Sequence, residues 1–250
     1  MPRVMVVNTK GGVGKSTVAQ QVLVPFMYEK QGQPIKLVEI DELNYDSTVL
    51  NNSAVIDRTF LKLNQLSELT ELLVNDNIVI DTGGNLSGEN VLSYMNESGI
   101  ILLVEMFVIP LTDGEQDSVN AVDTAKKIKS FNPNANIVFA LNRVRNIENE
   151  RDIKLQFPAW YGFEGIEGLR PEGAKEIYVP DSLAVKYSRH FGVTVYEIAN
   201  QDVEVMRKKL LEATKNKDTK RMKAISDRIY LINKSKDFVQ SVFPQLEKLF

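Results

Sequence analysis

The stretch Lys10-Gly11-Gly12-Val13-Gly14-Lys15-Ser16-Thr17 decides the fold of this chain. It directly follows an apolar run at residues 3–7, so the pattern predicts a buried strand, a glycine loop and a helix that begins at Lys-Ser-Thr. Glycines let backbone N–H groups approach a phosphate with no Cβ in the way, and a helix start adds unpaired N–H groups. The sequence therefore predicts a phosphate-binding loop.

Two side chains of this loop have chemistry of their own. Lys15 is expected to reach the β- and γ-phosphates of ATP, and Ser16 to offer its hydroxyl to Mg²⁺. The usual loop has glycine six residues before the lysine, where this chain has Thr9. A second lysine, Lys10, follows immediately. The predicted phosphate-binding loop consists of Lys10, Gly11, Gly12, Val13, Gly14, Lys15, Ser16 and Thr17.

The form Lys-Gly-Gly-x-Gly-Lys-Ser/Thr resembles the deviant Walker A loop of the ParA/MinD family of ATPases. The resemblance implies a P-loop NTPase fold of the α/β class, with a parallel β-sheet flanked by helices. It also implies that the chain forms a homodimer with ATP, in which Lys10 reaches across to the partner's nucleotide. The resemblance predicts Lys10, Lys15 and Asp41 as catalytic residues. It also implies that the whole loop, residues 10–17, binds ATP.

Composition narrows the class of protein. The chain has 250 residues, of which 43% are hydrophobic and 25% charged, as expected for one globular domain spanning residues 1–250. It has no cysteine, which excludes thiol catalysis and disulfides, and the single His190 excludes a multi-histidine metal site. No apolar run approaches the roughly 18 residues of a membrane span, so a cytoplasmic protein is expected.

The net charge of −3 is unevenly distributed along the chain. Residues 201–250 contain twelve basic and seven acidic residues, a net charge of +5, so residues 1–200 carry −8. A basic end of this kind suits a polyanion. Contacts with the backbone of DNA, without reading of the bases, are predicted for Arg207, Lys208, Lys220, Arg221, Lys223 and Arg228.

Strand and helix patterns alternate along the chain, which predicts a parallel sheet. Strands are expected at residues 3–8, 35–40, 78–80, 100–104, 137–141 and 176–179. Helices are expected at 16–30, with an interruption at Pro25, at 59–63, 66–74 and 117–131, and as a basic pair within about 202–249, broken near 216–218.

Acidic residues follow two of the predicted strands. Asp81 comes at the end of an apolar strand, the Walker B position, where a carboxylate holds Mg²⁺ through water. Asp41 matches an acid that orients the attacking water in the ParA/MinD family, but Glu39 and Glu42 are alternatives for this role. Residues 83–87 are either a switch that responds to the γ-phosphate or a plain loop.

The base of the nucleotide has two predicted contacts. The resemblance implies that Asn142, after the strand at 137–141, bonds to adenine, because an amide can both donate and accept. It also implies that Pro180 lines the adenine pocket.

The function that the resemblance implies is slow, partner-stimulated ATP hydrolysis in plasmid or chromosome partition. The ATP-bound dimer would bind DNA non-specifically, associate with the nucleoid and be released by an adaptor protein. One alternative is a positioning ATPase for a protein cargo or a conjugation accessory ATPase. Another is a MinD-like membrane-associated ATPase, which the apolar residues 238–250 suggest, although Pro244 should interrupt such a helix. A metabolic enzyme of the same loop superfamily is a further alternative.

Overall fold

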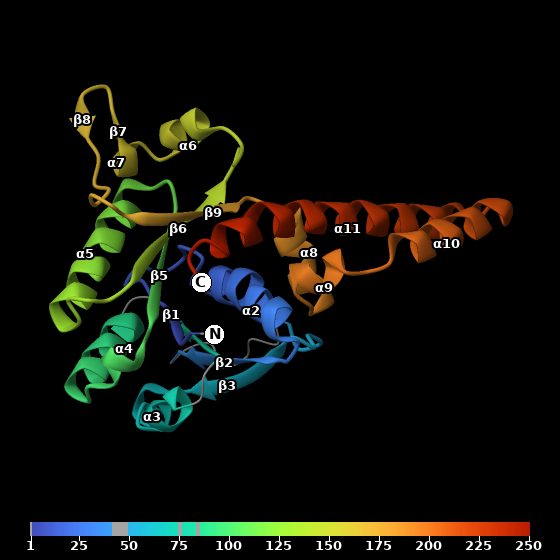
Figure 1. The fold of residues 1–250 in the computed structure, drawn as a ribbon. Coiled ribbons are helices and arrows are strands. Elements are labelled where there is room, and N and C mark those ends of the chain that lie inside the picture. The colour runs from blue at the N-terminus through green and yellow to red at the C-terminus, as the bar shows by residue number, and fades with distance from the viewer. Residues whose placement is uncertain (1, 42–49, 75–76, 84–85) are drawn as a thin grey trace.

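The computed structural model describes residues 2–41, 50–74, 77–83 and 86–250. Seven parallel strands form a twisted central sheet in the order β3-β2-β4-β1-β5-β6-β9 (Figure 1). The strands are β1 (Val4–Val6), β2 (Ile35–Ile40), β3 (Ile56–Leu61), β4 (Ile78–Thr82), β5 (Met106–Leu111), β6 (Ile137–Val144) and β9 (Lys175–Pro180). Two short strands, β7 (Gly162–Phe163) and β8 (Ile166–Glu167), form a separate antiparallel hairpin.

Helices cover both faces of the sheet, so the strands are buried on two sides and are almost continuously apolar. The first face carries α3 (Glu68–Leu73), α4 (Leu86–Glu97), α5 (Glu115–Phe131), α6 (Glu150–Gln156) and α7 (Pro158–Tyr161). The second carries α1 (Lys15–Val18), α2 (Val24–Gln31), α8 (Leu183–Phe191), α9 (Val195–Ala199) and the end of α11 (Thr219–Leu246). A further helix, α10 (Val203–Lys215), packs on α11.

The strand order reverses at β1. This strand pairs with β4 on one side and β5 on the other, so β2, β3 and β4 lie on one side of it and β5, β6 and β9 on the other. In parallel sheets, ligands bind in the crevice at the carboxyl ends of the strands where the order reverses. The glycine loop follows β1, so the topology places it at this crevice.

One predicted strand is wrong. Residues 100–104 do not form a strand: a 3₁₀ turn occupies Ile100–Leu103 and the strand begins later, as β5. The apolar run continues from one segment into the other, so composition alone does not choose between them. Gly99 has a φ of +74° and starts the turn, and Leu102 is 64% exposed, whereas β5 is buried between β1 and β6.

The helical piece predicted at 59–63 is also wrong. Residues Ile56–Leu61 form β3, an edge strand whose backbone pairs with β2 along its whole length. Arg58 of β3 forms an ion pair with Glu39 of β2, with Nε and Oε2 3.2 Å apart. Pairing with a distant segment decided the conformation here. The helix expected at 66–74 is confirmed as α3, after a short 3₁₀ turn at Leu63–Gln65.

Pro25 and Pro244, which were both expected to interrupt helices, behave differently. A π-helical turn at Ala19–Leu23 precedes Pro25, which lies in the first turn of α2, where a missing N–H is tolerated. The predicted interruption is therefore confirmed. Pro244 does not end α11, which continues to Leu246, so that expectation is wrong. The Gln245 side chain bonds to the backbone of Tyr178 in the edge strand β9, with its Oε1 2.8 Å from Tyr178 N, and holds the helix end in place.

The expected pair of basic helices is confirmed as α10 and α11, with the break at residues 216–218. Figure 1 shows that α10 and the first part of α11 form an arm that extends away from the sheet. The other end of α11 packs on the core through Phe238, Val242, Phe243 and Leu246. No helix among the described residues is long and apolar enough to cross a membrane.

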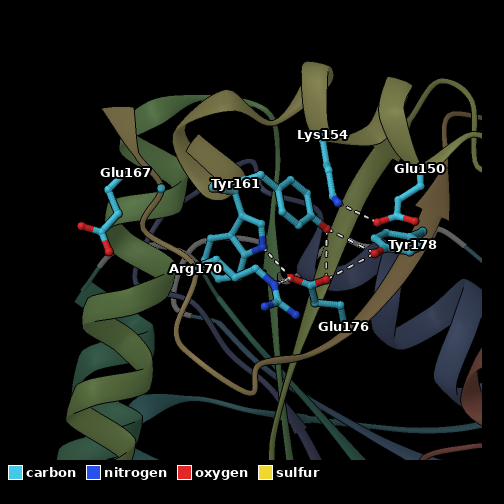
Figure 2. Close-up of a pocket in the computed structure, with 9 residues that line it drawn as sticks. Glu150, Lys154, Tyr161, Glu167, Arg170, Glu176 and Tyr178 are labelled. Carbon is cyan, nitrogen blue, oxygen red and sulfur yellow. Dashed lines mark hydrogen bonds and ion pairs between the residues drawn. The ribbon is translucent and has the colours of Figure 1, made fainter. Parts of the chain in front are cut away.

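Side-chain hydrogen bonds to Glu176 hold the segment between β6 and β9 against the edge strand β9. The carboxylate of Glu176 accepts hydrogen bonds from Trp160 Nε1 at 2.7 Å, Arg170 Nε at 2.6 Å and Tyr161 Oη at 3.0 Å. Figure 2 shows Arg170 and Tyr161 pointing toward Glu176. Trp160 is fully buried against Phe139 of β6. A two-stranded hairpin is at best marginally stable alone. The contacts of Glu176 with Trp160 and Tyr161 before the β7–β8 hairpin and with Arg170 after it therefore stabilise the hairpin.

Candidate nucleotide-binding site

The glycine loop lies between β1 and α1, where the sequence predicts it. Gly14 has a φ of +95°, and a Cβ at this position would lie 1.8 Å from Asn142 Nδ2. No residue other than glycine fits there without moving Asn142. Gly12 also has a positive φ, of +81°, so the loop has a curvature that glycine makes possible.

Two buried polar side chains shape the start of the loop, and the sequence analysis did not identify them. The Asn8 side chain accepts a hydrogen bond from Lys10 N at 2.8 Å and donates one to Pro110 O at 2.8 Å. Thr124 of α5 lies against Thr9, with its Oγ1 3.4 Å from Thr9 N. In the sequence, the one signal for the role of Asn8 is that it follows an apolar strand.

Lys15 is buried and points back along the loop. Its Nζ donates to Lys10 O at 2.7 Å. Burial lowers the pKa of Lys15, and the charges of Asp81 and Asp41 oppose that effect. The three side chains are therefore neighbours at the crevice, although they come from three different segments.

Asp81 is the most perturbed acid of the site. Burial raises its pKa to about 7, a hydrogen bond from Ser16 opposes the shift, and Glu39 adds to it. Its Oδ1 is buried and accepts no hydrogen bond from the part of the chain that the structure describes. A buried carboxylate oxygen beside a hydroxyl is a suitable donor set for Mg²⁺, directly or through water. Ser16 and Asp81 therefore fit the predicted metal site.

Glu39 and Asp41 have different surroundings. Glu39 is buried, accepts a hydrogen bond from Gln20 and forms an ion pair with Arg58, which fixes its carboxylate inside the fold. Asp41 is less buried and lies over Gly83, where a Cβ would come 3.0 Å from the Asp41 Cγ. Glu42 and most of the predicted switch at 83–87 lie outside the described residues or have no described side chains.

Lys10 presents its backbone to the loop and its ammonium to the surroundings. The backbone N and O of Lys10 bond to Asn8 and Lys15. Its Nζ has no hydrogen bond or ion pair within the described ranges of the chain.

The two predicted base contacts lie side by side. Asn142 pairs with Val179 in the sheet, and Pro180 is the next residue along β9. The Asn142 amide already donates to Val13 O at 3.1 Å and accepts from Arg143 N at 3.0 Å. One N–H and one lone pair of this amide are left for adenine, so a role in base binding stays a prediction.

Arginines that the sequence analysis missed lie on both sides of the loop. Arg143 has a φ of +61° in a β-bulge, and its Nη2 lies 3.4 Å from Gly12 O. Arg189 of α8 donates to the Thr17 hydroxyl at 2.7 Å. Neither residue belongs to a motif, and only the packing of distant segments brings them to the loop.

Five of the six residues predicted to bind DNA are exposed on the arm: Arg207, Lys208, Lys220, Arg221 and Lys223. Arg228 is different, because it is partly buried, stacks on Phe191 at 4.3 Å and donates to Gln201 at 2.9 Å. Burial lowers the pKa of its guanidinium.

No protein-family model and no curated protein sequence matches this chain. Solved structures do resemble it. MinD, a cell division protein of Aquifex aeolicus, has 13% sequence identity and a TM-score of 0.51, over 92% of this chain and 95% of that chain. Apo McdA of Cyanothece has 12% identity and a TM-score of 0.51, over 92% and 99%. An ATP complex of Cyanothece McdA has 12% identity and a TM-score of 0.50, over 79% and 90%.

These likenesses, together with the parallel sheet and the loop after its central strand, define a P-loop NTPase fold. More particularly, the chain has the fold of MinD and McdA, which confirms the ParA/MinD-type architecture that the loop predicts. Identities of 12–13% support the fold only.

Proposed function

We propose that this chain is an ATPase of the ParA type that dimerises on ATP and hydrolyses it slowly until a partner protein stimulates it. The supporting observation is one loop with two lysines, Lys10 and Lys15, of which Lys15 lies near Asp81 and Asp41 at the ends of the neighbouring strands. The related McdA structure is an ATP complex, which supports ATP as the nucleotide. The whole chain would act as one domain.

Each residue of the site has a chemical role in this proposal. Lys15 exchanges its bond to the Lys10 carbonyl for the β- and γ-phosphates, and Ser16 and Asp81 hold Mg²⁺. When bound, Mg²⁺ neutralises charge on these phosphates. Asp41 accepts a hydrogen bond from the attacking water and orients it toward the γ-phosphate. Glu39 is already occupied by Gln20 and Arg58, which favours Asp41 for this role.

Dimerisation follows from the position of Lys10. Its ammonium has no partner among the residues described, so the second nucleotide of a face-to-face dimer is its proposed partner. A cation that bonds only across the interface couples dimer formation to the presence of ATP, because the phosphates of ATP are its ligand.

The basic arm supports a role in partition of plasmid or chromosomal DNA. The five exposed residues predicted to bind DNA lie on α10 and α11, which extend away from the acidic body, and this arrangement suits non-specific contact with phosphates. Two arms per dimer double the contacts, so the ATP-bound form would associate with the nucleoid in the cytoplasm. An adaptor protein would stimulate hydrolysis and release the dimer.

A protein cargo in place of DNA is the second candidate function, since the fold is shared with MinD and McdA alike. The membrane alternative is weaker, because the apolar side chains of residues 238–246 pack on the core instead of facing outward.

The test is to measure the mass of the purified protein by light scattering with ATP, ADP or no nucleotide, and its binding to arbitrary duplex DNA under the same conditions. The proposal expects a dimer and a DNA shift with ATP only. A monomer in ATP would contradict the ATPase mechanism. An ATP dimer that leaves DNA unshifted at low salt would favour a protein cargo.

A further inference from the structure

Arg189 connects α8 to the first turn of the loop helix. Its Nη2 donates to Thr17 Oγ1 at 2.7 Å, a contact between residues 172 positions apart in the chain. No acidic partner of Arg189 is present in the described ranges, and its side chain is exposed. A guanidinium has five N–H donors, so most of them are free for a ligand at this place.

The contact is built into the fold. Ser182, which follows the Pro180-Asp181 pair, caps the N-terminus of α8 by accepting a hydrogen bond from Ala184 N at 3.1 Å. Beyond the other end of α8, Val195 N donates to the buried Gln21 side chain at 2.7 Å. The Ser182 contact fixes the start of α8 itself, and the Gln21 contact joins the segment after α8 to the π-helical turn that continues α1.

The order of groups along a nucleotide indicates which group lies at Thr17. In the proposed site, Lys15 and Ser16 contact the β- and γ-phosphates, and Asn142 and Pro180 contact the base. The α-phosphate lies between these two ends, and α8 begins at Leu183, three residues after Pro180. A cation from α8 that reaches the loop helix therefore meets the middle of the nucleotide.

We infer that Arg189 is a nucleotide-binding residue that contacts the α-phosphate together with the Thr17 hydroxyl, in the same protomer. The inference rests on the proposed ATP-binding function and adds a third cation to Lys10 and Lys15. With Arg189 donating to it, the Thr17 hydroxyl directs its own hydrogen away, and both groups can donate to one phosphate oxygen. Loss of a charge-assisted bond of this kind should weaken nucleotide binding by about tenfold.

The experiment measures ADP affinity by calorimetry for wild type, Arg189→Ala, Arg189→Lys and the matched control Lys186→Ala, which removes an exposed cation from the same helix. Arg189→Ala should weaken ADP binding about tenfold, Arg189→Lys should recover part of the loss, and Lys186→Ala should bind like wild type. The thermal midpoint of each variant checks that it is folded.

A second measurement distinguishes direct contact of Arg189 with the α-phosphate from an indirect structural role of Arg189. ADP with sulfur in place of one α-phosphate oxygen exists as two diastereomers, and wild type should discriminate between them. Arg189→Ala should lose much of that discrimination. Equal ADP affinity in Arg189→Ala and wild type would overturn the inference, as would weaker binding with the diastereomer preference intact. Failure of wild type to bind ADP would instead overturn the proposed function.

Discussion

Glu39 and Asp81 lie directly opposite each other on the neighbouring strands β2 and β4, and both are buried. Two carboxylates this close disfavour each other's ionisation. Glu39 has Arg58 and Gln20 as partners, whereas Asp81 has the Ser16 hydroxyl and one oxygen without a partner among the residues that the structure describes. Burial raises the pKa of Asp81 to about 7, and the charge of Glu39 adds to this rise.

This relationship predicts that Asp81 makes the folded state less stable as pH rises from about 4 to 7. Over that range the folded state keeps a proton on Asp81 that the unfolded state has lost, so the free energy of unfolding falls with pH. Asp81→Asn removes this dependence. Denaturant unfolding without nucleotide should show the variant gaining stability relative to wild type as pH rises from 4 to 8. A constant difference would contradict the buried-acid account. The same variant should lose Mg²⁺-dependent hydrolysis.

Lys15→Ala should abolish nucleotide binding. The loop is shaped for an anion, and Lys15 is the cation buried inside it. Titration with a fluorescent ATP analogue checks this, and the thermal midpoint shows whether the variant is folded. Unchanged affinity would mean that residues 10–17 do not bind a nucleotide.

Lys10→Ala should behave differently from Lys15→Ala. Because its ammonium has no partner within the described part of the protomer, its removal should leave nucleotide binding measurable. ATP-dependent dimerisation and hydrolysis should be lost. Light scattering with and without ATP is the measurement, and Lys62→Ala is a control that removes a lysine outside the loop. A variant that still dimerises on ATP would remove Lys10 from the interface.

Asp41→Ala should trap the ATP dimer, because the phosphate contacts remain while the acid that we propose orients the water is gone. Turnover should fall on the order of 100-fold or more with binding retained. Glu39→Gln should instead lower stability by about 1–3 kcal/mol, because Arg58 loses a buried ionic partner. Normal hydrolysis in Asp41→Ala together with inactive, folded Glu39→Gln would reverse the assignment.

Reversing Lys220, Arg221 and Lys223 to Glu should abolish most DNA binding and flatten its salt dependence. Each neutralised phosphate contributes about −0.9 to the slope of log affinity against log salt. A matched control reverses Lys126, Arg145 and Arg151, which are exposed basic residues outside the arm. Gel shifts at two salt concentrations with ATP decide the matter. Equal losses in both variants would indicate an effect of net charge and would contradict a role for the arm.

The sequence alone determined the parts of this protein whose information is local. The strand, loop and helix around residues 10–17 could be predicted because glycine spacing and a buried apolar strand are properties of neighbouring residues. The segments of β2, β4, β6, β9 and α5 followed from patterns of the same kind. The basic pair of helices was equally visible, since charge and helical periodicity need no distant partner.

Tertiary structure decided the features that depend on distant segments. Pairing with β1 decided that the strand forms at β5 and not at residues 100–104. Residues 56–61 form the strand β3 because they pair with β2. The site shows the same dependence: Asn142 against Gly14, Glu39 held by Arg58 and Arg189 on Thr17 join residues between 19 and 172 positions apart. No local pattern encodes such contacts, because a side chain finds these partners only after the sheet has assembled and fixed which strand ends meet.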